Sequence, residues 1–196
     1  MRFAVSLELV GIYCIPVILI LLGVLPFQYR FVYLTLMGAF VGLLAYRRGY
    51  TLEELGLKGG NIRLDIALNG LLVLVFLSFF SVAYFAGMFG RKFIPESAFF
   101  YIFYVLISCP VQEFLYRSYF FALLQKSKCS EMHCVVLCSA IAFSFLHTIY
   151  HDVVTLVAVF AAGIAWAFIY AKTKSFYGVC MSHALFGTMT ILAGLV

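Results

Sequence analysis

Three apolar stretches of this sequence contain the polar and ionisable side chains most able to do chemistry. One carries the pair Gln112 and Glu113 followed by Arg117, and the other two carry His147 and His183. Glu113 and Arg117 are four residues apart, so they share one face of a helix and can pair. A charge inside a membrane span costs roughly 2.5–3.5 kcal/mol on insertion scales. A chain this apolar should keep such groups for a function, and we treat them as site candidates.

A carboxylate and two imidazoles that converge inside a dry helical bundle are suited to hydrolysis. The carboxylate and one histidine can hold and deprotonate a water molecule, while the second histidine donates to the oxyanion that develops. Pro110 cannot donate its helical hydrogen bond, which should loosen the turn just before Gln112. Each histidine alone is a weak signal, because a lone intramembrane histidine often hydrogen-bonds a neighbouring helix.

The composition indicates a membrane protein. The chain has 196 residues, of which 65% are hydrophobic and 11% charged, and its mean hydropathy is +1.10. Average chains carry about 25% charged residues, and a spanning helix needs about 20 mostly apolar ones. We expect an all-α polytopic transmembrane bundle of about seven spans in a single domain covering residues 1–196. The expected spans are residues 4–26, 31–46 (a short one), 64–88, 98–124, 132–150, 153–171 and 175–195.

The cations predict an orientation. The net charge of +5 does not come from a basic run, so we expect no nucleic-acid partner. With seven spans, three cations fall on one side, namely Arg30, Arg91 and Lys92. Nine fall on the other: Arg2, Arg47, Arg48, Lys58, Arg63, Lys126, Lys128, Lys172 and Lys174. The positive-inside rule then places the N-terminus in the cytoplasm and the C-terminus outside.

Two further patterns lead to structural expectations. Thr51 and Glu54 form a capping-box pattern, and the leucines around them predict either a short amphipathic turn at the membrane surface or an ordinary connecting helix. The six cysteines lack metal-ligand or disulfide-framework spacing, and we expect them to be small buried apolar residues. They are Cys14, Cys109, Cys129, Cys134, Cys138 and Cys180.

Taken together, the three polar stretches resemble the CAAX protease and bacteriocin-processing family of glutamate-type intramembrane endopeptidases. The family pattern is Glu-Glu-x-x-x-Arg on one helix, Phe-x-x-x-His on a second and His-x-x-x-Asn (or Asp) on a third. Here these motifs fall, in the same order, on Gln112-Glu113…Arg117, Phe143…His147 and His183…Gly187. The resemblance runs from about residue 50 to the end, and residues 52–57 (Leu-Glu-Glu-Leu-Gly-Leu) are similar to the family's segment ahead of its third helix.

The resemblance implies roles for these residues. The first glutamate of the motif and His147 would activate the attacking water, and His183 with the family's asparagine would stabilise the oxyanion. Glu113 and Arg117 would be a supporting pair. Hydrolysis would use no metal, no cofactor and no covalent intermediate. The substrate would be a membrane-associated protein or peptide cut near its C-terminal or membrane-proximal segment, and we expect a bacterial cytoplasmic membrane as the location.

Two positions depart from the family pattern. Gln112 stands where the first glutamate is expected, and an amide cannot act as a general base, a loss worth about 10²–10⁴-fold in rate. Gly187 stands where the asparagine is expected, and a lost oxyanion donor costs about 10²–10³-fold. Thr188 could partly substitute, although it points about 100° around the helix. Three interpretations of Gln112 stay open: an engineered replacement, an active divergent member in which Glu113 is the base, or a natural pseudoenzyme.

Other functions compete with this prediction. His147 and His151 with Glu113 suggest a metal site, and Cys134 or Cys138 with His147 suggests a thiol nucleophile. A non-enzymatic membrane scaffold, immunity-like protein or small transporter would need the charged pair only for helix packing. The aromatic residues beside the pair either pack helices or line a groove for an apolar substrate; they are Tyr116, Tyr119, Phe120 and Phe121.

Overall fold

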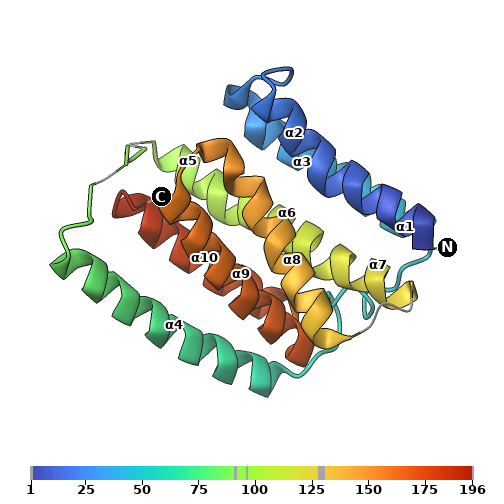
Figure 1. Cartoon of the computed structure of the whole chain (residues 1–196). Helices are drawn as coiled ribbons and strands as arrows, with labels where there is room; N and C mark the ends of the chain where they lie inside the picture. The colour runs from blue at the N-terminus through green and yellow to red at the C-terminus, as the bar shows by residue number, and fades with distance from the viewer. Residues whose placement is uncertain (1, 91, 96, 128–130, 196) are drawn as a thin grey trace.

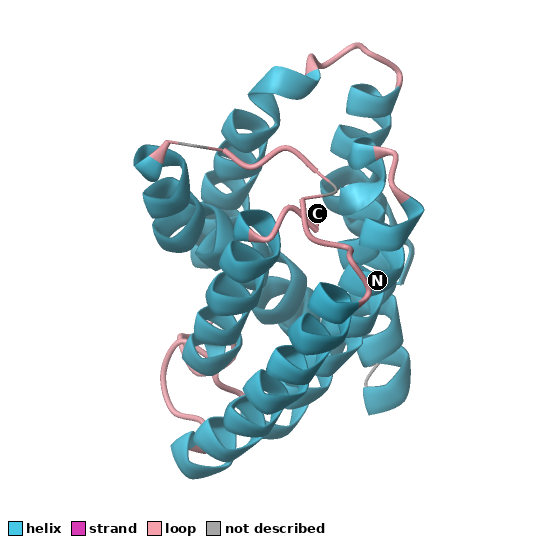
Figure 2. Ribbon diagram, turned by 90° about the vertical axis from the view of Figure 1, so that its left-hand side faces the viewer, coloured by secondary structure: helices cyan, strands magenta, loops and turns pink. Residues whose placement is uncertain are grey.

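The computed structural model describes residues 2–90, 92–95, 97–127 and 131–195, with side chains from residue 5 onward. All regular elements in these residues are helices, which confirms the all-α prediction (Figures 1 and 2). Three residues used in the sequence analysis, Arg91, Lys128 and Cys129, lie outside the described residues, as does the side chain of Arg2.

The helices and turns of the described residues form seven continuous helical segments, which we call rods and number in chain order. The first combines α1 (Arg2–Leu9), a π-helical turn (Val10–Cys14) and α2 (Ile15–Leu21). The second is α3 (Arg30–Arg47), and the third is α4 (Ile62–Phe85). The fourth combines α5 (Ala98–Phe103), α6 (Cys109–Glu113) and α7 (Phe120–Lys126), joined by π-helical turns at Tyr104–Ser108 and Phe114–Tyr119. The last three are α8 (Met132–Leu146), α9 (Val153–Thr173) and α10 (Phe176–Leu192).

Five helices among the described residues are long and apolar enough to cross a membrane, so the expected seven spans are not confirmed. The five are Phe27–Arg47, Ile62–Phe85, Ala98–Lys126, Met132–Tyr150 and Val153–Thr173. The helix expected to be short, the second, is long enough, because a 3₁₀ turn at Phe27–Tyr29 extends it. The short apolar helices are instead the first and the last, Val5–Leu21 and Phe176–Leu192. Both end before the expected limits, at turns containing Gly23 and Gly194, which have positive φ.

The rods lie side by side and run back and forth along a common direction (Figure 1). Helices α1, α2 and α3 lie along one side of the bundle and α4 lies along the opposite side. The rod of α5, α6 and α7, together with α8, α9 and α10, fills the space between, and α8 packs mainly along α9. The three motif-bearing helices are therefore among the four interior ones, and helices without motifs cover the interior on two sides.

Short polar residues set where two of the long helices begin. The Asn61 side chain accepts a hydrogen bond from the Leu64 backbone N–H at 3.1 Å, and the Asp152 carboxylate accepts one from Thr155 N–H at 3.1 Å. Each cap satisfies an N–H that the first helical turn would otherwise leave unpaired. The caps fix the start of α4 and of α9, and Asp152 also sits at the rim of the cavity described below.

The motif-bearing rod is wound irregularly on both sides of Pro110. The π-helical turn Tyr104–Ser108 ends immediately before Cys109 and Pro110, and a second begins directly after Glu113. Pro110 has no N–H to give to a regular helical hydrogen bond, so the backbone around it is wound more loosely. The residues directly before Gln112 are α-helical, so the looser winding lies on either side of the expected turn and places Gln112 and Glu113 between two widened turns.

Two other sequence predictions are settled by the structure. The capping box at Thr51 and Glu54 forms, with reciprocal hydrogen bonds of 2.7 and 3.1 Å, but a chain of turns follows it rather than a helix, and Leu55 is buried. The prediction that the cysteines are buried is wrong for α8. Cys109 is buried and Cys14 and Cys180 are half-buried, whereas Cys134 and Cys138 are exposed on the outer face of α8.

Ionisable groups outside the interior rods also pair. Glu8 on α1 accepts a hydrogen bond from Arg48 at 2.7 Å and another from the Tyr119 hydroxyl. The hydrogen bond with Glu8 raises the pKa of Arg48, which lies just beyond the end of α3. These contacts tie the first two rods to the fourth. The aromatic residues beside the charged pair, Tyr116, Tyr119, Phe120 and Phe121, are all buried, which favours helix packing over a substrate groove.

Candidate active site

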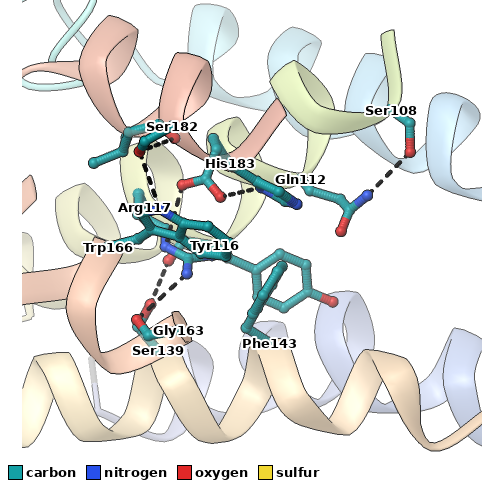
Figure 3. Close-up of polar contacts among 12 residues, drawn as sticks. Ser108, Gln112, Tyr116, Arg117, Ser139, Phe143, Gly163, Trp166, Ser182 and His183 are labelled. Carbon is teal, nitrogen blue, oxygen red and sulfur yellow. Dashed lines mark hydrogen bonds and ion pairs between the residues drawn. The ribbon is translucent and has the colours of Figure 1, made fainter. Parts of the chain in front are cut away.

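The centre of the bundle holds an ion pair that is closed to solvent. The Arg117 Nε lies 3.2 Å from Glu113 Oε2, and both side chains are 0% exposed. The Arg117 guanidinium lies 4.3 Å from the centre of the Phe143 ring and donates to the Gly163 carbonyl oxygen at 3.4 Å. Because the pair is contacted from α8 and α9 at once, it fixes how these helices sit against the motif-bearing rod (Figure 3).

His183 on α10 is oriented by the same carboxylate. Its Nδ1 lies 2.7 Å from the second oxygen, Glu113 Oε1, and its ring stacks on that of Trp166 at 4.5 Å between centres (Figure 3). Since a carboxylate oxygen accepts, Nδ1 carries a proton and Nε2 is directed away from Glu113. Glu113 therefore contacts Arg117 with one carboxylate oxygen and His183 with the other.

His147 is oriented by backbone. Its Nδ1 donates to the Phe143 carbonyl oxygen at 2.9 Å, and the two rings lie 4.9 Å apart. Because a carbonyl oxygen can only accept, Nδ1 carries the proton and the neutral ring has its lone pair on Nε2. A lone pair held in this way can take a proton from water.

The Gln112 side-chain amide has a hydrogen-bond partner at its nitrogen and none at its oxygen among the described residues. Its Nε2 donates to Ser108 Oγ at 3.0 Å, one helical turn earlier (Figure 3). Its Oε1 is buried and accepts no hydrogen bond from the described residues. A buried polar atom without a partner costs about 1–3 kcal/mol, which favours a site where it meets water or a ligand.

A cavity of about 350 Å³ connects these groups. Gln112, His147, His183 and Gly187 line its inner part, with Trp166 and Phe186 among the apolar lining residues. Phe27, Arg30, Lys92, Tyr150 and Asp152 line it toward one end of the bundle. Glu113 and Arg117 are fully buried behind this wall. The structure thus brings the two histidines and Gln112 to one cavity and places the ion pair behind them.

A chain of hydrogen bonds that the sequence analysis passed over leads from α4 to this cavity. The buried Asp65 carboxylate accepts from Asn69 Nδ2 at 3.0 Å, and the Asn69 Oδ1 accepts from Ser182 Oγ at 2.7 Å. The Ser182 Oγ accepts from Trp166 Nε1 at 3.0 Å, and the Trp166 ring stacks on His183. Asp65 and Asn69 are four apart in an apolar span, which is the same signal that identified Glu113 and Arg117.

The structure does not bring together the residues of the alternative metal site or those of the alternative thiol nucleophile. His151 adopts a left-handed conformation, with φ of 51°, after the 3₁₀ turn His147–Tyr150, and its side chain is exposed. Within the described ranges, no three His, Cys, Asp or Glu side chains form a cluster that could hold a metal ion. Cys134 and Cys138 are exposed on α8, on a different face from His147, which lines the cavity.

Fold and site define a polytopic α-helical membrane protein whose largely apolar cavity is lined by a few polar residues, among them Gln112, His147 and His183. The comparison with family models assigns it more narrowly. The model described as type II CAAX prenyl endopeptidase Rce1-like matches residues 94–189, which contain every motif residue from Gln112 to Gly187. Over these residues the chain belongs to the CAAX protease and bacteriocin-processing family. Searches of curated proteins and of solved structures returned no further match.

Proposed function

We propose that this chain is an intramembrane endopeptidase that hydrolyses a peptide bond by direct attack of water. The observation that carries the proposal is the convergence of Gln112, His147 and His183 on one cavity, all within the residues that match the family model. His147 takes the proton of the attacking water through Nε2. His183 donates from Nε2 to the carbonyl oxygen as that oxygen becomes an oxyanion. The imidazole ring must then be protonated on both nitrogens, and the carboxylate of Glu113 stabilises its positive charge.

In this mechanism Gln112 positions the water but does not activate it. Its free Oε1 can accept a hydrogen bond from the water, while the bond to Ser108 holds the amide in place. The alternative in which Glu113 has become the base fits poorly. Both oxygens of that carboxylate are engaged, by Arg117 and by His183, and the side chain lies behind the cavity wall. The chain as it stands is therefore a slow or silent enzyme, whether Gln112 is natural or introduced.

The cavity favours an apolar peptide segment as substrate. Its lining is mostly aromatic and aliphatic, and its 350 Å³ accommodates a few residues rather than a folded domain. We place the substrate among membrane-associated proteins or peptides cut near a C-terminal or membrane-proximal segment.

The cavity should open on the non-cytoplasmic side. Its outer lining includes Arg30, Lys92 and Asp152, which lie on the side with few cations, whereas the connections rich in cations lie at the other end. Under the positive-inside rule the cation-rich end is cytoplasmic. In intact cells with native cysteines replaced, Lys92→Cys should react with an impermeant maleimide, and the control Lys58→Cys should not. The reverse labelling pattern would contradict this orientation.

The proposed activity is tested by removing His147. Purified chain in lipid vesicles should cleave peptides with an apolar membrane-proximal segment slowly, and mass spectrometry should locate a single internal cut. We expect His147→Ala to lose the remaining activity, because no other described group lining the cavity offers an imidazole lone pair held in this way. Cleavage that persists in His147→Ala would contradict the base assignment, and cleavage abolished by a chelator would contradict the metal-free mechanism.

A scaffold or immunity-like role is the second candidate. The observation that favours it is Gln112 itself, since an amide cannot serve as the general base. Such a protein would bind a partner's apolar segment in the cavity and release it uncut. Binding of an intact peptide that is never cleaved, even with glutamate at position 112, would favour this role over the peptidase.

A further inference from the structure

Tyr104 occupies the space that Gly187 leaves empty. A Cβ built on Gly187 would collide with the Tyr104 hydroxyl oxygen and lie 2.8 Å from its Cζ and 3.0 Å from its Cε1. These are ring atoms of a buried side chain, so they cannot move aside as the end of a flexible chain could. Position 187 therefore cannot carry a side chain while Tyr104 keeps this place.

The Tyr104 hydroxyl also faces the reactive part of the cavity. It lies 3.5 Å from His183 Nε2, and it lines the same cavity as Gln112 and His147. Two donors at this separation can both reach one oxygen atom that lies about 2.8 Å from each. The hydroxyl is thus a polar group at the point where a substrate carbonyl would contact His183.

The backbone and a neighbouring ring hold Tyr104 in this position. It is the first residue of the π-helical turn Tyr104–Ser108, which ends two residues before Pro110. Its ring stacks on that of Phe100, one turn earlier, with 6.2 Å between centres and 18° between planes. A donor fixed before the reaction stabilises developing charge without reorganisation at the moment of reaction.

We propose that the Tyr104 hydroxyl is the second oxyanion donor of this site, in place of the side chain that position 187 lacks. The inference rests on the proposed function. As the water oxygen bonds to the carbonyl carbon, the π electron pair moves onto the carbonyl oxygen and His147 takes the water proton. Tyr104 and His183 hydrogen-bond that oxygen, and Tyr104 keeps its own proton. When the C–N bond breaks, the pair returns to the carbonyl and the proton on His147 passes to the leaving amine.

The decisive change is Tyr104→Phe, which removes one oxygen and keeps the ring stacked on Phe100. In a Gln112→Glu background we expect kcat to fall by about 10²–10³-fold with KM little changed, as for loss of one oxyanion donor. Tyr101→Phe is the matched control, because Tyr101 lies on the same rod as Tyr104, donates its hydroxyl to the Pro95 carbonyl oxygen and does not line the cavity. It should leave kcat unchanged. An unchanged kcat in Tyr104→Phe would overturn the proposal.

A rescue experiment with double variants at positions 104 and 187 distinguishes a hydrogen-bonding role of Tyr104 from a packing role. Tyr104→Ala frees the space beside position 187, so adding Gly187→Asn should restore part of the lost kcat by supplying an amide donor. Gly187→Asn alone should be inactive, because its side chain collides with Tyr104. If Tyr104 only fills space, Tyr104→Ala should gain as much from Gly187→Leu as from Gly187→Asn, and that result would also overturn the proposal.

A binding measurement tests the donor without any turnover. A peptidyl phosphonate carries tetrahedral anionic oxygens like those of the intermediate. It should bind the chain with Gln112 unchanged about 10²-fold more tightly than the Tyr104→Phe variant, whereas the uncleaved amide peptide should bind both equally. If hydrolysis is absent but phosphonate binding depends on Tyr104, the proposed reaction fails and the oxyanion site stands. Equal phosphonate binding by both chains overturns the inference.

Discussion

Replacing Gln112 by glutamate should raise the rate of peptide cleavage by about 10²–10⁴-fold, the usual worth of a positioned general base. The side chain is the same size, and its free oxygen already faces the cavity with His147 and His183. A carboxylate there could share the water proton with His147, which an amide cannot. The measurement is the initial rate of cleavage in lipid vesicles, with the cut located by mass spectrometry.

The matched control for this change is Gln125→Glu. Gln125 is exposed on α7, the end of the same rod, and is not among the residues that line the cavity. Gln125→Glu replaces an amide by a carboxylate and adds one negative charge, as Gln112→Glu does. Because this change lies away from the cavity, it should leave the cleavage rate unchanged. A Gln112→Glu chain that folds, binds peptide and stays as slow as its parent would remove the support for a peptidase and favour the scaffold.

Removing the cation of the central ion pair should destabilise the bundle by about 3–5 kcal/mol, the cost of leaving one charge of a buried pair uncompensated. In Arg117→Met the long apolar side chain keeps much of the packing against Phe143, while Glu113 retains His183 as its one polar partner among the described residues. The free energy of unfolding, measured in mixed detergent micelles by denaturant titration, gives the cost.

Two further variants identify the cause of that cost. Adding Glu113→Gln to Arg117→Met removes the unpaired charge and should recover part of the lost stability. Lys126→Met removes an exposed cation whose partner is Glu54, at 3.3 Å, and should cost less than about 1 kcal/mol. If Arg117→Met is as mild as Lys126→Met, the ion pair does not organise the interior helices.

The sequence predicted the helical class and the three site helices, because both rest on local signals. Long apolar runs specify spans, and a charge inside such a run indicates a position that must find a partner. The loosening around Pro110 could be predicted for the same reason, since it depends on one missing N–H. Span limits were less predictable. Turns with positive φ at Gly23 and Gly194 end the first and last helices early, and hydropathy alone does not reveal them.

Tertiary packing decided what the sequence analysis missed. Whether a cysteine on an apolar helix faces protein or lipid depends on which face meets a neighbour, so Cys134 and Cys138 could not be placed from composition. In the sequence Tyr104 is one aromatic residue among many, and tertiary packing alone places its hydroxyl in the space beside Gly187. Asp65, in contrast, carried a readable signal, a carboxylate inside an apolar span, and could have been singled out.

The measurement that tests the central claim most directly is a double-mutant cycle between position 112 and position 147. Cleavage rates are compared for the unaltered chain, Gln112→Glu, His147→Ala and the double variant. If both residues act on one water molecule, glutamate at position 112 should accelerate cleavage about 10²-fold or more with His147 present and have no measurable effect without it. An equal acceleration in both backgrounds would show that the two side chains do not serve one reaction centre.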